Sequence, residues 1–158
     1  ADLSNNYGNL VQRITTFCVK NCNSNIKNNL NFTKADKNLI EFMNLKFDEY
    51  KKFMNEEKID KSIKCVFELL SDTNAYIDTE APWNLKNTNK DRMNNVLFLT
   101  LNIIKNSSIM LIPVMPDSAN KILDILNINK TERNFDHITI SRNDYKINNP
   151  KPIFPRID

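Results

Sequence analysis

The chain has a single glycine, Gly8, among its 158 residues. Sheets joined by tight hairpins usually need several glycines, because the favoured two-residue turns place residues at positive φ. A chain with one glycine is therefore expected to be helical. Asparagine is abundant, and we expect it at some left-handed turns and caps, since it tolerates that backbone region better than most residues. The length predicts a hydrophobic core that needs no disulfide or metal.

Apolar residues recur every three or four positions along the chain, which is typical of amphipathic helices. We expect helices over residues 1–20, 35–55, 56–79 and 90–111, and a short one beginning at Pro116, whose ring suits a first helical turn. The predicted fold is all-α, an antiparallel bundle of about five helices with an irregular C-terminal tail. The expected inward-facing residues are Leu3, Tyr7, Leu10, Ile14 and Phe17, then Leu39, Met43, Phe47, Tyr50 and Met54, then Ile59, Ile63, Val66, Leu70 and Ile77, and finally Met93, Leu97, Leu101, Ile104 and Leu111.

The helical pattern fades after residue 126. We therefore predict a helical domain over residues 1–126 and an irregular extension over 127–158 that packs on the bundle or on a domain outside this chain. The polar residues 21–34 are expected to form a loop. Within the extension, residues 137–147 alternate weakly and could form a short strand or an extended stretch, whereas the proline-rich end must be extended.

No arrangement of residues typical of a catalytic site is found. One glycine cannot build a phosphate-binding loop, and His137 is the only histidine. Ser–His–Asp chemistry would have to use this one side chain, in a weakly patterned region. We interpret the acidic residues near helix ends as capping or solvated groups; they are Glu56, Glu57, Asp78 and Glu80. The sequence thus predicts no catalytic residues.

The cysteines and the charges are equally uninformative about a ligand. Cys18, Cys22 and Cys65 are too few for a zinc site with one distant histidine, so we expect reduced thiols and no metal. The net charge of +3 permits an RNA partner, but the lysines are scattered. No segment is apolar for long enough to span a membrane.

Three motifs together are specific. They are ADLSNNYGNLVQR at residues 1–13, YIDTEAPWNL at 76–85 and LIPVMPDSANKI at 111–122, with PIFPRI closing the chain at 152–157. In this order and spacing they resemble the C-terminal anticodon-binding domain of bacterial-type methionyl-tRNA synthetases. The resemblance covers nearly the whole chain.

The resemblance implies that Asn9, Arg13 and Trp83 contact the CAU anticodon of tRNA(Met). The residue types suit that role. Asn9 and Arg13 are four residues apart, so they project from one face of a helix. An amide offers a donor and an acceptor to a base edge, and a guanidinium can make paired hydrogen bonds. Trp83, the only tryptophan, follows Pro82 and could stack on an unpaired base. A lone tryptophan is otherwise more often a core residue.

The resemblance also implies a larger enzyme. The parent would be a cytoplasmic methionine–tRNA ligase that uses ATP and magnesium, with zinc as a further candidate, in its catalytic part. This chain lacks the HIGH and KMSKS signatures of that part and its zinc knuckle. The chain alone is therefore expected to be non-catalytic and to hold no cofactor. Its partners would be the anticodon stem-loop of tRNA(Met) and its own catalytic domain.

Two alternatives remain open from the residues. The first is the helical anticodon domain of another class I synthetase, such as one for leucine, isoleucine, valine or cysteine. The second is a helical protein-interaction module that uses an exposed tryptophan and the proline-rich tail.

Overall fold

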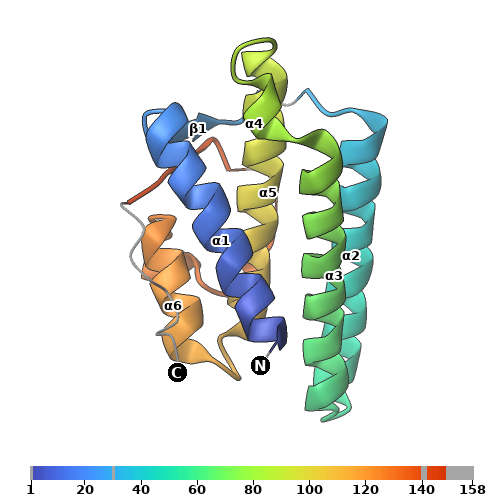
Figure 1. Cartoon of the computed structure of the whole chain (residues 1–158). Helices are drawn as coiled ribbons and strands as arrows, with labels where there is room; N and C mark the ends of the chain where they lie inside the picture. The colour runs from blue at the N-terminus through green and yellow to red at the C-terminus, as the bar shows by residue number, and fades with distance from the viewer. Residues whose placement is uncertain (1, 30, 140–141, 149–158) are drawn as a thin grey trace.

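The computed structural model describes residues 2–29, 31–139 and 142–148, which form a helical bundle (Figure 1). The predicted all-α fold is confirmed, and the five expected helices are present as α1, α2, α3, α5 and α6. The elements in chain order are α1 (Asp2–Asn21), β1 (Asn25–Lys27), α2 (Lys34–Asn55), α3 (Ile59–Glu80), α4 (Pro82–Leu85), α5 (Lys90–Leu111), α6 (Pro116–Ile125), the 3₁₀ turns η1 (Lys130–Glu132) and η2 (Phe135–His137), and β2 (Asp144–Lys146).

Helices α2 and α3 form an antiparallel hairpin at one side of the bundle (Figure 1). A capping box starts α2: the Thr33 side chain accepts from the Asp36 N–H, and the Thr33 N–H donates to the Asp36 carboxylate. Such a box satisfies amide groups that a helix leaves free at its first turn. The hairpin turn places Glu57 at φ 60°.

Left-handed positions are filled without glycine. Two of the five non-glycine residues with positive φ among the described residues are asparagines, Asn23 and Asn127, as expected. The others are Ser24, Glu57 and Ala81. A residue with a Cβ in this region costs about 1–2 kcal/mol, so tertiary contacts must hold these turns in place.

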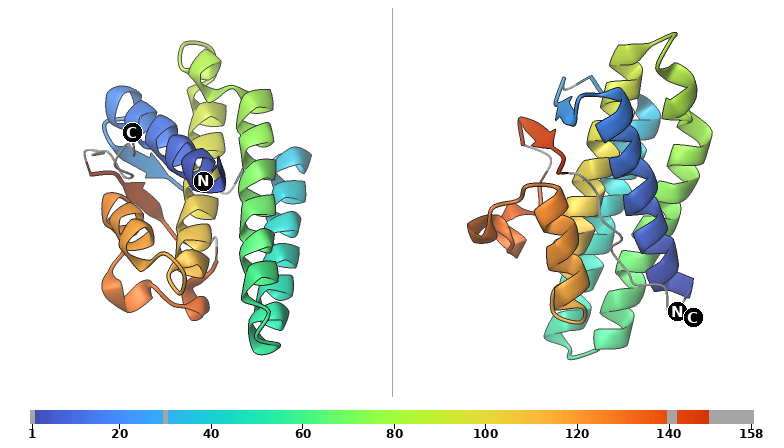
Figure 2. Two further views of the ribbon diagram at one scale, coloured as in Figure 1. Left: turned by 60° about the horizontal axis from the view of Figure 1, so that its bottom comes forward. Right: turned by 60° about the vertical axis from the view of Figure 1, so that its left-hand side comes forward.

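Helix α5 is the centre of the fold (Figure 2). It contacts α1, α3, α4, α6 and both strands, and every residue from Asn95 to Leu111 is buried. The predicted single apolar stripe was therefore too narrow for this helix, because neighbours cover it on all sides. Some of its buried polar groups have partners far along the chain: the Met110 carbonyl, for example, accepts from Tyr50 Oη over 2.7 Å.

Two local predictions were wrong. The expected loop 21–34 contains β1, which pairs antiparallel with β2 so that Ile26 faces Tyr145. Ile59 is 42% exposed rather than inward-facing, because it stands at the first position of α3. The helix expected to end at residue 79 ends at Glu80, and Pro82 begins the short helix α4.

The described part of the tail packs on the bundle. Tyr145 is fully buried, its ring centroid lies 5.3 Å from that of Phe98, and the Asn148 N–H donates to the Ile125 carbonyl over 2.8 Å. A strand within residues 137–147 was one of two predicted possibilities, and β2 occupies part of that range. The closing motif at residues 152–157 lies outside the described residues, as does the side chain of Leu3. No helix among the described residues has the length and apolarity that crossing a bilayer requires.

Candidate functional site

Two of the three predicted site residues meet in space. The Arg13 guanidinium, on α1, lies over the Trp83 ring of α4, with its central carbon 5.1 Å from the ring centroid. A cation within about 6 Å of an indole face is attracted by the ring quadrupole. Arg13 is exposed, and Trp83 is half-buried and packs against the core. The pair thus forms a partly accessible cationic and aromatic surface.

The turn from α3 into α4 places Trp83 there. Ala81 adopts the left-handed conformation at φ 44°, ends α3, and donates its N–H to the Ile77 carbonyl over 2.8 Å. Pro82 then starts α4, a position where its missing N–H leaves no bond unmade. The chain reverses direction at this point, and α4 lies at the end of the bundle away from the start of α1 (Figure 1).

Asn9 lies one turn before Arg13 on the same exposed face of α1. The opposite face of the helix is buried through Leu10 and Ile14. Among the described residues the Asn9 amide has no hydrogen-bond partner, whether Trp83 or any other side chain. Its donor and acceptor groups are therefore available to a ligand that lies along this face.

The sequence interpretation missed the role of Asp78. Its Oδ1 lies 3.5 Å from Arg13 Nη1, and the two side chains are 66% and 44% exposed. An exposed pair of this kind contributes little stability, but it limits the directions in which the Arg13 guanidinium can point. Asp78 is on α3, and no local sequence pattern shows that it faces α1.

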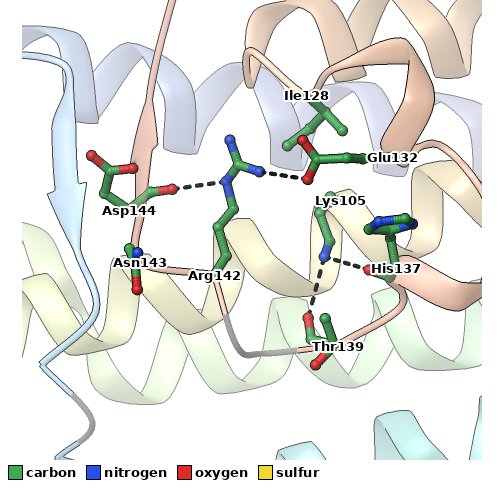
Figure 3. A pocket seen from close by; sticks show the side chains of 8 residues that line it. All are labelled: Lys105, Ile128, Glu132, His137, Thr139, Arg142, Asn143 and Asp144. Atoms are coloured by element: carbon green, nitrogen blue, oxygen red, sulfur yellow. Dashed lines mark hydrogen bonds and ion pairs between the residues drawn. The ribbon is translucent and has the colours of Figure 1, made fainter.

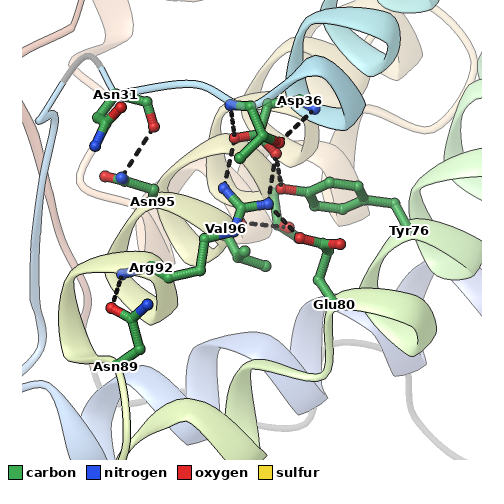
Figure 4. A network of polar contacts seen from close by, with 10 residues as sticks. Asn31, Asp36, Tyr76, Glu80, Asn89, Arg92, Asn95 and Val96 are labelled. Atoms are coloured by element: carbon green, nitrogen blue, oxygen red, sulfur yellow. Dashed lines mark hydrogen bonds and ion pairs between the residues drawn. The ribbon is translucent and has the colours of Figure 1, made fainter.

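A second acidic residue, Glu80, was also missed, and it belongs to a buried network (Figure 4). Arg92 on α5 donates from Nη1 to Asp36 Oδ2 over 2.6 Å and from Nη2 to Asp36 Oδ1 over 2.9 Å. Arg92 also forms an ion pair with Glu80 at the end of α3. Tyr76 Oη donates to the Asp36 carboxylate over 2.6 Å. This network, Asp36–Tyr76–Glu80–Arg92, joins α2, α3 and α5 next to α4.

A separate cavity of about 370 Å³ lies between α5 and the tail (Figure 3). Lys105 points into it and donates to the carbonyls of His137 and Thr139, over 2.8 and 3.2 Å. Burial and the nearby Arg142 lower the pKa of Lys105 to about 8. Lys105 is thus held by the tail backbone. The only histidine lines this cavity, with its Nδ1 2.8 Å from Asn134 Oδ1. Within the described ranges, no three His, Cys, Asp or Glu side chains are grouped as a metal site.

Comparison with known proteins identifies the family. Residues 26–157 match the model of the anticodon-binding domain of methionyl tRNA ligase. A methionine–tRNA ligase of Rickettsia conorii is 37% identical over 169 residues, covering 100% of this chain and 32% of the relative. A methionine–tRNA ligase of Brucella suis is 31% identical over 158 residues, covering 99% of this chain and 31% of the relative.

Solved structures are similar in the same way. The apo methionyl-tRNA synthetase of Mycobacterium tuberculosis superposes with a TM-score of 0.92 at 26% identity, over 100% of this chain and 33% of that one. The same organism's enzyme bound by methionyl-adenylate gives a TM-score of 0.90 at 26% identity, over 98% of this chain and 32% of that one. The chain spans about a third of the length of the curated relatives it matches. These findings favour neither another class I synthetase nor a protein-interaction module. The chain belongs to the family of the anticodon-binding domain of methionyl tRNA ligase.

Proposed function

We propose that this chain reads the CAU anticodon of tRNA(Met) as part of a methionine–tRNA ligase. The observation that carries the proposal is the Arg13 guanidinium lying over the partly accessible Trp83 ring, on the helix face that also presents Asn9. Unpaired anticodon bases leave their edges and faces free, and proteins read such bases by stacking and by hydrogen bonds.

The three side chains would have different roles in binding, which follow from their chemistry. Trp83 stacks on one base, which supplies affinity but does not select the base, since every base has a π face. Arg13 can donate two parallel hydrogen bonds to a base edge or grip a phosphate. The Asn9 amide both donates and accepts, so it selects a base by the pattern of that base's edge. Arg13 and Asn9 therefore provide the discrimination.

The rest of the parent's activity would lie in another part of the enzyme. Relatives named methionine–tRNA ligase are about three times as long as the matching region, and the Mycobacterium tuberculosis enzyme is known bound by methionyl-adenylate. We infer that ATP, magnesium and zinc, where they are used, act in that part. The domain would hold the anticodon stem-loop in the cytoplasm so that the acceptor end reaches the catalytic part.

Replacing Trp83 with alanine tests the proposal. We expect the dissociation constant for an anticodon stem-loop RNA carrying CAU to rise about 5- to 150-fold, since a stacked base contributes about 1–3 kcal/mol. The measurement is a titration followed by fluorescence anisotropy of labelled RNA at fixed salt. Phe135→Ala is the matched control, because Phe135 is also a partly exposed aromatic, 41% exposed, but it packs on Phe47 and Tyr50 away from α4. Equal binding by the Trp83 variant and the parent chain would contradict the proposal.

Asn9→Ala and Arg13→Lys test the discrimination. We expect each variant to lose most of the preference for CAU over a GAU loop, because a good polar contact to a base is worth about 1–3 kcal/mol of selectivity. Arg13→Lys keeps the positive charge, so the slope of affinity against salt should stay nearly unchanged. The ratio of the two dissociation constants is the quantity to measure. A preference for CAU that Arg13→Lys retains, together with a salt slope that Arg13→Ala reduces by about one, would place Arg13 on a phosphate instead.

A further inference from the structure

One ion pair connects the two ends of the segment that carries Trp83. Glu80 is the last residue of α3 and Arg92 lies in the first turn of α5, so their ion pair joins the two ends of residues 80–92 (Figure 4). Helix α4 and the turn after it lie between these ends. The Asn89 side chain also accepts from the Arg92 N–H over 3.1 Å, which fixes the end of the turn to α5.

The Arg92 side chain is itself held firmly. It is 16% exposed, and its bidentate partner Asp36 is fully buried. The Asp36 carboxylate accepts further hydrogen bonds from Tyr76 Oη and the Thr33 N–H, over 2.6 and 3.0 Å. A guanidinium bonded to one carboxylate through two nitrogens has little freedom to rotate. Glu80 is therefore held in place by α2 and α5, through Arg92 and Asp36, as well as by its own helix.

Helix α4 needs this support because it has little intrinsic stability. It contains four residues, Pro82–Leu85, which is too short for a helix to persist alone. It follows Ala81, whose left-handed backbone is unfavourable for a residue with a Cβ. Contacts with α5 fix one side of α4. Its orientation must otherwise be fixed by the contacts at the two ends of residues 80–92.

We propose that Arg92 is a positioning residue for anticodon binding. Its ion pair with Glu80, which we call the clamp, holds the two ends of residues 80–92 together. The clamp thereby presents the Trp83 ring in the orientation that accepts a base. The inference rests on the proposed function. A ring already held in its bound orientation loses less conformational freedom on binding, so the clamp raises affinity without touching RNA.

The test uses two variants of the clamp and one matched control. Glu80→Gln removes the charge that pairs with Arg92, and Arg92→Lys keeps the charge but cannot bond two carboxylates in the same planar arrangement. Glu68→Gln is the control: Glu68 is also on α3 and pairs with Lys46 of α2 at 3.0 Å, about three turns from Glu80. It removes an equivalent charge without touching the segment 80–92.

Trp83 is the only tryptophan, so its fluorescence reports the orientation of α4 directly. We expect both clamp variants to shift its emission and to increase its quenching by acrylamide. We also expect the dissociation constant for the CAU stem-loop to rise about fivefold, within the range of coupling inside one network. Glu68→Gln should change none of these three quantities, and its unfolding midpoint shows how much stability an ion pair between α2 and α3 contributes. A clamp that served only stability would lower the unfolding midpoint and leave Trp83 emission in the folded state unchanged.

A double variant with Trp83→Ala distinguishes the two proposals. If the clamp acts through Trp83, Glu80→Gln adds no further loss of RNA affinity once Trp83 is alanine. Equal losses in both backgrounds, or no loss with the parent Trp83 present, overturn the clamp and leave the proposed function standing. If Trp83→Ala alone does not weaken binding, the proposed function fails, and the role of the clamp in binding fails with it.

Discussion

Replacing Asp36 with alanine is expected to lower the free energy of unfolding at pH 7 by about 3–5 kcal/mol, because one partner of a buried ion pair would remain without its counter-charge. The carboxylate is fully buried and accepts two hydrogen bonds from Arg92 and one from Tyr76. It also completes the capping box of Thr33. One substitution therefore loosens α2, α3 and α5 together. Denaturant unfolding followed by circular dichroism measures the change.

The same variant has a pH signature. Burial opposes ionisation of Asp36, but the hydrogen bonds from Arg92, Tyr76 and the Thr33 backbone outweigh it, and the pKa of the carboxyl is lowered from its ordinary value. A carboxyl with a lowered pKa in the folded state stabilises the fold above its unfolded pKa, near 4. That contribution is lost as the pH falls through the folded pKa. The difference in stability between the parent chain and Asp36→Ala should be largest near neutral pH and should shrink below about pH 4.

An exposed carboxylate on the same helix provides the control. Asp48 is 72% exposed and lies 3.6 Å from Lys51. Surface pairs of this kind contribute about 0–1 kcal/mol, so Asp48→Ala should change stability little and with little dependence on pH. If Asp36→Ala were no more destabilising than Asp48→Ala, the network Asp36–Tyr76–Glu80–Arg92 would not be holding the three helices together.

The local sequence pattern predicted the helices because the apolar spacing and the terminal residues that mark a helix lie within that helix. Apolar spacing located α1, α2, α3, α5 and α6, and Pro116 marked the start of α6. The environment of α5 could not be predicted in this way. Its polar residue Asn102 is buried, and Tyr145, from the tail, donates to its Oδ1 over 2.7 Å. A side chain whose partner lies far along the chain gives no periodic signal.

The same reasoning applies to the strands and to the candidate site. Strand β1 is three residues long with one buried residue, and it exists because β2 pairs with it. Arg13 and Trp83 were predicted from motifs that resemble a family, and the structure brings them into contact. The partners of Asp78 and Glu80, however, depend on how α1 and α5 pack against α3. These contacts arise only from the tertiary fold.

Replacing Tyr145 with alanine is the second change with a large expected effect, a loss of about 3–5 kcal/mol in the free energy of unfolding. Tyr145 is fully buried, packs against Phe98, and belongs to the strand pair that joins the tail to residues 25–27. Its removal would leave a cavity beside α5, and the Asn102 amide would lose a hydrogen bond. Asn102 Nδ2 already has no partner among the described residues, so loss of the Tyr145 hydroxyl would leave both polar atoms of this buried amide unpaired there.

Tyr145→Phe separates packing from hydrogen bonding. It keeps the ring and should cost about 1–3 kcal/mol, the penalty for leaving the buried Asn102 acceptor unpaired. Hydrogen exchange then shows how far the tail is part of the bundle. If residues 127–148 fold together with α5, Tyr145→Ala should speed exchange in the centre of α5 as well as in β1 and β2. Faster exchange confined to the strands, with an unchanged global stability, would instead make the tail a separate unit that only rests on the helices.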